Sequence, residues 1–200
     1  MKHINKLLII FLFSGFFTGN LFSQTFRSGF LLGASGSQID GDSQSGYSKP
    51  GVFAGVFVKT GSELKKGLFI ELYYIGKGAL KKVEQVGGTS YQEYKVNLNY
   101  IEMPVMYGFG ITKRVGLKGG IAPSYLFKAK VFDRGSELIS PPYELRNIDF
   151  SSMFQADFSL NDKIGFNVKF SYSLLSIRKD IWWHNNNLCI GFRYNISKAE

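Results

Sequence analysis

The feature that most constrains this chain is a regular series of strand-like segments whose connections alternate between long and short. After residue 25 there are eight such segments of about ten residues, the length of a tilted strand that crosses a bilayer. The segments are 26–38, 51–60, 68–77, 94–109, 115–127, 149–160, 164–175 and 188–196. The second, fourth and sixth connections are short, as in antiparallel hairpins whose short turns gather at one end of a closed sheet.

The last three segments alternate between bulky apolar residues and small or polar residues, a period of two that excludes a helix. In segment 164–175 one face includes Phe166 and Phe170, and the other includes Asn167 and Ser171. The interior of an eight-stranded barrel is only wide enough for side chains, so a row of phenylalanines would overfill it. We therefore expect the aromatic face to meet lipid in an all-β fold, an eight-stranded antiparallel transmembrane β-barrel. A soluble lipocalin-like barrel with its apolar face inward is the alternative.

The fourth segment, 94–109, interrupts this regularity. Pro104 has no backbone N–H to donate to a neighbouring strand, and the alternation slips near Tyr100 and Ile101. A β-bulge inserts one extra residue into a strand and disturbs its pairing locally. The sequence therefore predicts a bulge within this segment.

The first 24 residues have the composition of a secretory signal peptide. Lys2 and Lys6 give a positive start, an apolar run of eleven residues covers 7–17, and small or polar residues then lead to the cleavage point. Eleven apolar residues are too few to span about 30 Å of hydrocarbon as a helix, which argues against a membrane anchor. We expect residues 1–24 to be the signal peptide and residues 25–200 to be the barrel domain, in the outer membrane of a Gram-negative bacterium.

The predicted mature chain is basic. Removing the signal peptide leaves 22 basic and 15 acidic residues, a net charge of +7. Nucleic acid is a poor partner for an exported protein, so we expect anionic outer-membrane lipid or lipopolysaccharide phosphate as the partner. The residues expected to contact lipopolysaccharide from the predicted outer loops are Lys81, Lys82, Lys128, Lys130, Arg178 and Lys179. Ordinary solvated loop charge is the alternative.

Alternation also places charged side chains inside the predicted barrel. They are Glu71, Glu102, Lys118, Asp157, Lys169 and Arg193, with Glu102 inside provided that the bulge is placed correctly. Isolated charges in a narrow, poorly hydrated interior are costly, so we expect these acids and bases to pair across the barrel and to fill it. A proton or ion path along them is the alternative.

Aromatic residues near the strand ends predict the two interfacial girdles of a membrane barrel. The girdle residues at the outer ends are Tyr73, Tyr74, Trp182 and Trp183, and those at the inner ends are Tyr107 and Tyr194. A carbohydrate-binding platform is the alternative for the two tryptophans.

No residue set in the sequence supports catalysis strongly. His184 is the only histidine after the predicted signal peptide, and a hydrolase site needs a nucleophile, a base and an acid grouped together. Asp180 is close in sequence, but no serine partner is identifiable. Cys189 is the single cysteine, so it can form neither an intrachain disulfide nor a metal site by itself. We expect no enzyme, no cofactor and no metal, with a deacylase-type site at His184 as the alternative.

Four stretches of the chain form a recognisable set. They are 71–79 (Glu-Leu-Tyr-Tyr-Ile-Gly-Lys-Gly-Ala), 98–106 (Leu-Asn-Tyr-Ile-Glu-Met-Pro-Val-Met), 119–123 (Gly-Gly-Ile-Ala-Pro) and 191–196 (Gly-Phe-Arg-Tyr-Asn-Ile). They resemble the E-L-x-Y-x-x-K-G-A stretch, the L-x-Y-L-E-I-P-L-L strand, the G-x-G-P strand and the closing strand of the PorT-like family of outer-membrane β-barrel proteins. Two features depart from that pattern: Ala122 stands where glycine is usual, and four residues follow Ile196 where an aromatic residue usually ends the chain.

This resemblance implies a small eight-stranded barrel in the outer membrane, in a family found largely in Bacteroidota. Most members have no known activity, and the name-giving member belongs to an apparatus that exports proteins across the outer membrane. We therefore expect a non-enzymatic structural or interaction protein whose partners include envelope or secretion-machinery proteins. A small-solute channel and a lipid-modifying enzyme are the alternatives.

Overall fold

The computed structural model describes residues 26–42, 46–60, 66–84, 90–133, 136–138 and 143–196. The predicted signal peptide lies outside these residues. Within them, no helix is long and apolar enough to cross a membrane. The ten β-strands of the described chain belong to one antiparallel sheet.

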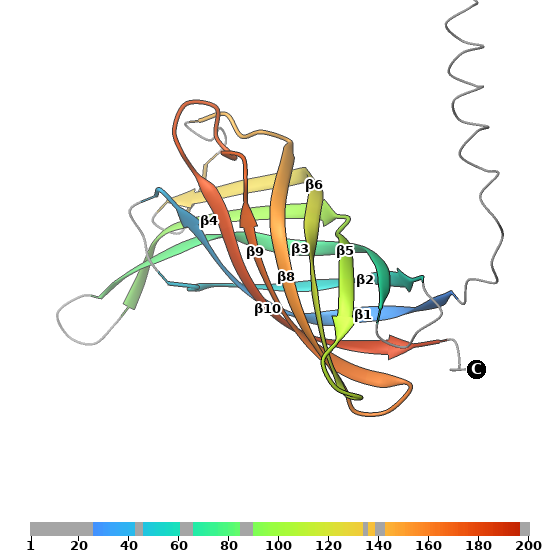
Figure 1. Cartoon of the computed structure of the whole chain (residues 1–200). Helices are drawn as coiled ribbons and strands as arrows, with labels where there is room; N and C mark the ends of the chain where they lie inside the picture. The colour runs from blue at the N-terminus through green and yellow to red at the C-terminus, as the bar shows by residue number, and fades with distance from the viewer. Residues whose placement is uncertain are drawn as a thin grey trace, which may run out of the picture.

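The sheet closes on itself as a barrel (Figure 1). The strands are β1 (Arg27–Asp40), β2 (Lys49–Lys59), β3 (Gly67–Glu84), β4 (Ser90–Glu102), β5 (Val105–Gly110), β6 (Val115–Asp133), β7 (Ser136–Glu137), β8 (Ile148–Ser159), β9 (Ile164–Ser173) and β10 (His184–Asn195). The first and last wall strands, β1 and β10, pair over twelve residue positions and so close the ring. Because the ring is closed, each wall strand has a hydrogen-bonded neighbour on both sides. A sheet in lipid requires this, because lipid offers its backbone groups no hydrogen bonds.

Strands β4 and β5 together form one wall strand, so the ring has the eight strands that the sequence predicts. Both of them pair with β3 on one side and with β6 on the other. Pro104 lies at the interruption between them, where its backbone oxygen accepts a hydrogen bond of 3.0 Å from the N–H of Glu71. The register against β6 shifts between Asn99 and Tyr100, which confirms the predicted bulge.

Several strands extend further than predicted at the end of the barrel opposite the short turns, and β3 and β6 do so by the most residues. β3 continues to Glu84 and stays paired with β4, while β6 continues to Asp133. The residues that therefore lie on strands, where outer loops were predicted, are Lys81, Lys82, Lys128 and Lys130. The loop prediction was wrong because strands that project beyond a bilayer no longer need an apolar face, so their composition is that of a loop.

The two faces of β8, β9 and β10 are those that the alternation predicts. Phe154, Phe170 and Phe192 project outward and are exposed, whereas Asn167 and Ser171 are buried in the interior. An exposed face of this size and aromatic content belongs to a barrel that meets lipid. A lipocalin-like barrel would bury it.

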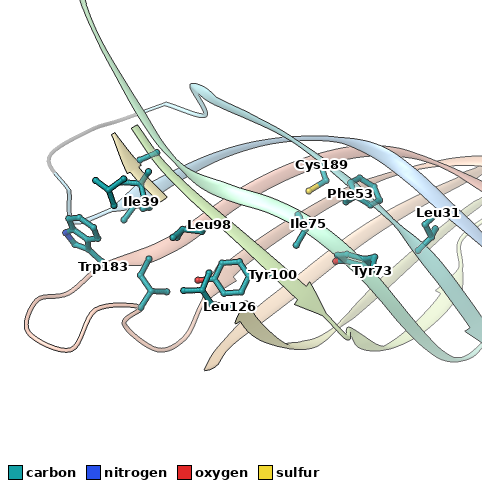
Figure 2. Close-up of a cluster of buried hydrophobic side chains, with 14 of the residues drawn as sticks. Leu31, Ile39, Phe53, Tyr73, Ile75, Leu98, Tyr100, Leu126, Trp183 and Cys189 are labelled. Atoms are coloured by element: carbon teal, nitrogen blue, oxygen red, sulfur yellow. The ribbon is translucent and has the colours of Figure 1, made fainter. Parts of the chain in front are cut away.

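The opposite wall of the interior carries large aromatic side chains, which alternation in the last three strands does not predict (Figure 2). Phe53 of β2, Tyr73 of β3 and Tyr100 of β4 are buried in one apolar cluster. The neighbouring strands β1 and β10 make room for them with glycines. A Cβ atom at Gly33 or Gly191 would lie 2.5 Å or 2.3 Å from the ring of Phe53. The glycine content of β1 and β10 is therefore a packing requirement of the interior.

Candidate functional site

The middle of the barrel interior holds two ion pairs. Glu71 on β3 pairs with Lys169 on β9, which lies on the opposite side of the ring. Lys77, also on β3, pairs with Glu102 at the end of β4. All four side chains are buried, and each charge has its own counter-charge at contact distance. This pairing is the condition under which a protein interior holds a charge without a large penalty.

Aromatic side chains complete this central network. The hydroxyl of Tyr73 donates a hydrogen bond of 2.7 Å to Glu102 Oε1. The ammonium group of Lys169 lies 4.4 Å from the ring centre of Tyr73 and 4.9 Å from that of Phe53, within the range of a cation–π contact. Tyr73 is only 3 % exposed, so its assignment to the outer girdle was wrong. It shares the inward face of β3 with Glu71, two residues away, because side chains alternate along a strand.

The prediction missed four buried charges that alternation could have found, Lys49, Lys59, Lys77 and Asp149. Lys77 follows Glu71 by six residues on the same face of β3. Asp149 shares the inward face of β8 and accepts hydrogen bonds from Ser173 Oγ at 2.7 Å and Asn185 Nδ2 at 3.1 Å. The six predicted interior residues all lie in the interior: Glu71, Glu102, Lys118, Asp157, Lys169 and Arg193.

The interior opens at the end of the short turns 111–114 and 160–163 into a cavity of ≈ 750 Å³, which we call the vestibule. At its inner part Lys118 Nζ lies 2.7 Å from Asp157 Oδ2, and Arg193 Nη1 lies 3.3 Å from the same oxygen. The ion-paired charges of the interior therefore divide into two groups. Two ion pairs lie in the middle of the barrel, and at its end two basic side chains share the carboxylate of Asp157.

The opposite end is covered by two segments that pack on each other, 143–147 and 176–183, which we call the cap. Arg146 N donates a hydrogen bond of 2.8 Å to the oxygen of Ile177. The guanidinium carbon of Arg178 lies 4.3 Å from the ring centre of Tyr143 and 4.4 Å from that of Trp183. Arg178 therefore contacts both rings of the cap, and one of them, Trp183, belongs to the apolar cluster of the interior.

Ion pairs on the surface of the cap add to this packing. Lys179 pairs with Glu144 and Arg178 with Asp180. The hydrogen bond from Lys179 holds the pKa of Glu144 below its usual value, and the hydrogen bond from Arg178 does the same for the pKa of Asp180. Burial raises the pKa of the Tyr143 hydroxyl, which is 2.6 Å from the hydroxyl of Tyr94.

The two neighbouring tryptophans have different surroundings. Trp182 is 82 % exposed, whereas Trp183 is 7 % exposed and packs against Tyr143 with ring centres 4.9 Å apart. Trp183 is therefore part of the cap and not of an aromatic girdle, so this prediction was wrong. The remaining predicted girdle residues lie on the outer surface: Tyr74, Tyr107, Tyr194 and Trp182.

A second hollow, of ≈ 590 Å³, lies on the barrel wall towards the cap end, and we call it the basic groove. The aromatic rings of Tyr74 and Phe127 contact each other at its edge, with centres 6.1 Å apart. Its lysines are Lys49, Lys77, Lys128 and Lys130. The six residues predicted to contact lipopolysaccharide therefore do not form one site, because Lys128 and Lys130 line the groove while Arg178 and Lys179 belong to the cap.

His184 lies at the start of β10 in surroundings that do not assemble a hydrolase site. Its ring stacks on Tyr172 with centres 5.7 Å apart, and Nδ1 is 2.9 Å from the backbone oxygen of Ser173. The carboxylate of Asp180, the predicted acid partner, is bound by Arg178 instead. Among the described residues, no group of three or more His, Cys, Asp and Glu side chains could hold a metal ion.

Comparison with known proteins gives a family and a set of similar folds. A family described as outer membrane protein beta-barrel domain matches residues 22–179. No curated protein sequence matches the chain significantly.

Two solved structures illustrate the similarity of fold. One is Ail, the attachment invasion locus protein of Yersinia pestis, in complex with the heparin analogue sucrose octasulfate. It has a TM-score of 0.55 and 13 % sequence identity, over 86 % of this chain and 99 % of Ail. The other is Neisserial surface protein A (NspA), with a TM-score of 0.53 and 13 % identity over 86 % of this chain and 97 % of NspA. At this identity the likeness concerns the fold alone.

Proposed function

Because this chain belongs to the outer membrane protein beta-barrel domain family and lies in the outer membrane, we propose that it acts as a non-enzymatic structural and interaction protein there. Its partners bind its surfaces, and solutes do not pass through it. The observation that carries this proposal is the paired interior: Glu71 with Lys169, and Lys77 with Glu102, in the midst of buried aromatic rings. Charges that are paired with one another across the barrel do not stabilise an ion in its interior.

The lipid partner that we propose is lipopolysaccharide, bound through its phosphates at the basic groove. Lys128 is exposed and directly follows Phe127, an exposed ring on the outer wall. Interfacial aromatic residues sit at the headgroup level of a membrane, so a lysine one residue beyond them is at the depth of the phosphates. Lys49 and Lys130 lie in the same groove.

The lipid contact is tested by Lys128→Glu, with Lys179→Glu in the cap as the matched control. Lipopolysaccharide that co-purifies with the protein from outer membranes is quantified by its phosphate. We expect the Lys128 variant to lose bound lipopolysaccharide and the control to retain it, because Lys179 already pairs with Glu144. Equal amounts on the wild type and both variants would contradict a specific contact at the groove.

The protein partner that we propose belongs to an envelope or protein-secretion assembly, and this part rests on the resemblance to the PorT-like family. The cap supports a role in recognition, because its segments are held by backbone hydrogen bonds and by the mutual contacts of Tyr143, Arg178 and Trp183. An ordered surface loses little conformational entropy when a partner binds.

Crosslinking in intact outer membranes tests this proposal. The tagged protein is recovered in detergent and its partners are identified by mass spectrometry. Recovery of secretion-machinery components is the expected result. Recovery of abundant porins alone, with no difference between the wild type and an Arg178→Ala variant of the cap, would contradict it.

A further inference from the structure

The outer wall carries a polar and aromatic patch that the proposed function does not use. It lies mainly on β1, β9 and β10, which pair side by side (Figure 1). It is at the end opposite the short turns; in outer-membrane barrels the short turns are periplasmic and this end faces outward. Seven residues joined by hydrogen bonds and ring contacts form this surface, which we call the rim patch: Gln38, Asp40, Tyr47, Tyr172, Trp182, His184 and Asn186.

The rim patch begins where the lipid-facing surface ends. Ile190 and Leu188 are exposed apolar residues on the outward face of β10. The next residues on that face are Asn186 and His184, two and four positions further along, or about 7 and 13 Å beyond Leu188. Amide and carboxylate groups are costly to place in hydrocarbon. The rim patch therefore lies just beyond the hydrocarbon, at the level of the lipid headgroups and of what is attached to them.

Hydrogen bonds fix the polar side chains of the rim patch in place. Asp40 Oδ1 accepts a bond of 2.6 Å from Gln38 Nε2, and Oδ2 accepts one of 3.2 Å from Asn186 Nδ2. The hydroxyl of Tyr47 donates to Asn186 Oδ1 at 2.8 Å, and the hydroxyl of Tyr172 also bonds to Asp40. A carboxylate has about four acceptor positions, so one remains for a ligand hydroxyl. Side chains that are already oriented lose little conformational entropy when a ligand binds.

An exposed aromatic ring stands beside these polar groups. Trp182 is 82 % exposed, and its ring meets His184 edge-on with centres 6.1 Å apart. Its backbone is held against Gly41, the residue after Asp40: a Cβ there would lie 2.0 Å from the oxygen of Trp182, and φ is 98°, which favours glycine. Most of the indole surface is therefore accessible next to the carboxylate. The face of an aromatic ring is electron-rich and attracts polarised C–H groups.

We propose that the rim patch binds an uncharged saccharide segment of lipopolysaccharide, with a sugar ring packed on Trp182 and its hydroxyl groups bonded to Asp40. A sugar ring presents C–H groups on its faces and hydroxyls at its edge, which matches an open aromatic ring beside oriented polar groups. None of the seven patch residues is a lysine or an arginine, which favours uncharged sugar over phosphate. A glycan anchored in the same membrane has a high effective concentration at this level, which favours it over a glycan from outside. The inference rests on the proposed lipopolysaccharide partner but uses a separate site, because the basic groove lies on β2, β3, β4 and β6.

Saturation-transfer NMR on the full barrel tests the proposal, in a detergent without a sugar headgroup. The probe is the dephosphorylated core oligosaccharide released from lipopolysaccharide of the same outer membranes. We expect saturable binding to the wild type and about tenfold weaker binding to Trp182→Ala, the loss of one aromatic contact. Trp182→Phe keeps a ring and should retain most of the affinity. Asp40→Asn should weaken binding about fivefold, because it removes a charged acceptor.

The matched control is Tyr107→Ala, which removes an exposed ring of β5 at the short-turn end of the barrel. We expect it to leave the affinity for the oligosaccharide within about twofold. The denaturant midpoint of Trp182→Ala should equal that of the wild type, because the ring is mostly exposed, and this separates a lost contact from a lost fold. An absence of binding to the wild type, or an equal loss in the Trp182 and Tyr107 variants, would overturn the proposal.

A second arm tests the source of the saccharide with maltoheptaose, an uncharged glucan that is not part of the membrane. We expect it to bind at least about tenfold more weakly than the core oligosaccharide. Equal or tighter binding of maltoheptaose would overturn the assignment to lipopolysaccharide. Lys128→Glu should leave the oligosaccharide affinity unchanged, because Lys128 lies in the basic groove. Failure of the oligosaccharide to bind would therefore remove the rim patch and leave the phosphate contact of the groove standing.

Discussion

The middle of the barrel and its periplasmic vestibule are built from the same alternating strands, yet they differ in how charge is balanced. In the middle, Glu71 and Glu102 each have one lysine, and all are buried. In the vestibule, Asp157 alone serves both Lys118 and Arg193 beside an open cavity. In the middle each charge has a partner of its own, whereas in the vestibule two bases share one carboxylate. The ratio of acids to bases on inward positions thus differs between the two regions.

The largest effect is expected from breaking a central pair. Glu102→Gln leaves the ammonium group of Lys77 buried without its counter-charge, and we expect a loss of about 3–5 kcal/mol in the free energy of unfolding. Denaturant titration in detergent micelles measures it. The double variant Lys77→Met with Glu102→Leu should recover most of the loss, because it removes both charges. A double variant as unstable as the single one would contradict the pairing argument.

Packing provides the next comparison between the two regions. Gly191→Ala places a methyl group 2.3 Å from the ring of Phe53, and we expect it to cost about 1–3 kcal/mol. Gly116→Ala in the vestibule is the control, since the added Cβ meets nothing nearer than 3.4 Å and should cost less than about 0.5 kcal/mol. Equal costs in denaturant titrations would show that the two regions are equally tightly packed, against this account.

A smaller loss of stability is expected when Asp157, the acid of the vestibule, is replaced. Asp157→Asn should cost about 1 kcal/mol, because Lys118 and Arg193 can be hydrated from the open cavity. The same denaturant titration compares it with Glu102→Gln. A loss as large as that of the central pair would mean that the vestibule is as dry as the middle of the barrel.

The smallest effect is expected at the exposed ion pair of the cap. Lys179 lowers the pKa of Glu144 in the folded state, so this contact stabilises the cap above the unfolded-state pKa. That stabilisation is lost as the pH falls through the folded-state value, in the region below about pH 4. Hydrogen-exchange protection of Arg146 N–H, which bonds to Ile177 across the cap, should fall there relative to the intrinsic exchange rate at the same pH. Glu144→Gln should abolish this pH dependence, and a persisting dependence would assign it to another group.

The sequence predicts the fold and the interior well because alternation is a local property. Period two places Glu71 and Lys169 inside, and applied to the ends of the predicted segments 68–77 and 149–160 it would also have placed Lys77 and Asp149 there. The same rule applied to Tyr73 would have kept it out of the girdle. These errors came from assigning aromatic residues by their distance from strand ends when their parity along the strand decides their direction.

Other features depend on relations between distant strands and could not be read from a local pattern. Strand β3 extends to Glu84 because β4 pairs with it, although its last residues are polar. Trp183 is buried because 143–147 packs over it. The vestibule needs the stagger of β6, β8 and β10, which brings Lys118 and Arg193 to one level around Asp157. The sequence alone shows which residues are charged, but it does not show that two bases meet one acid at this place.

The central claim is that the paired charges close the middle of the barrel, so that ligands bind at its ends and surfaces. Single-channel recording of the wild-type barrel in planar bilayers tests it most directly. We predict no stable conductance steps, because Glu71–Lys169 and Lys77–Glu102 fill the interior together with the surrounding aromatic rings. A large, long-lived conductance in the wild type would contradict the claim and would make the small-solute channel the better account of this protein.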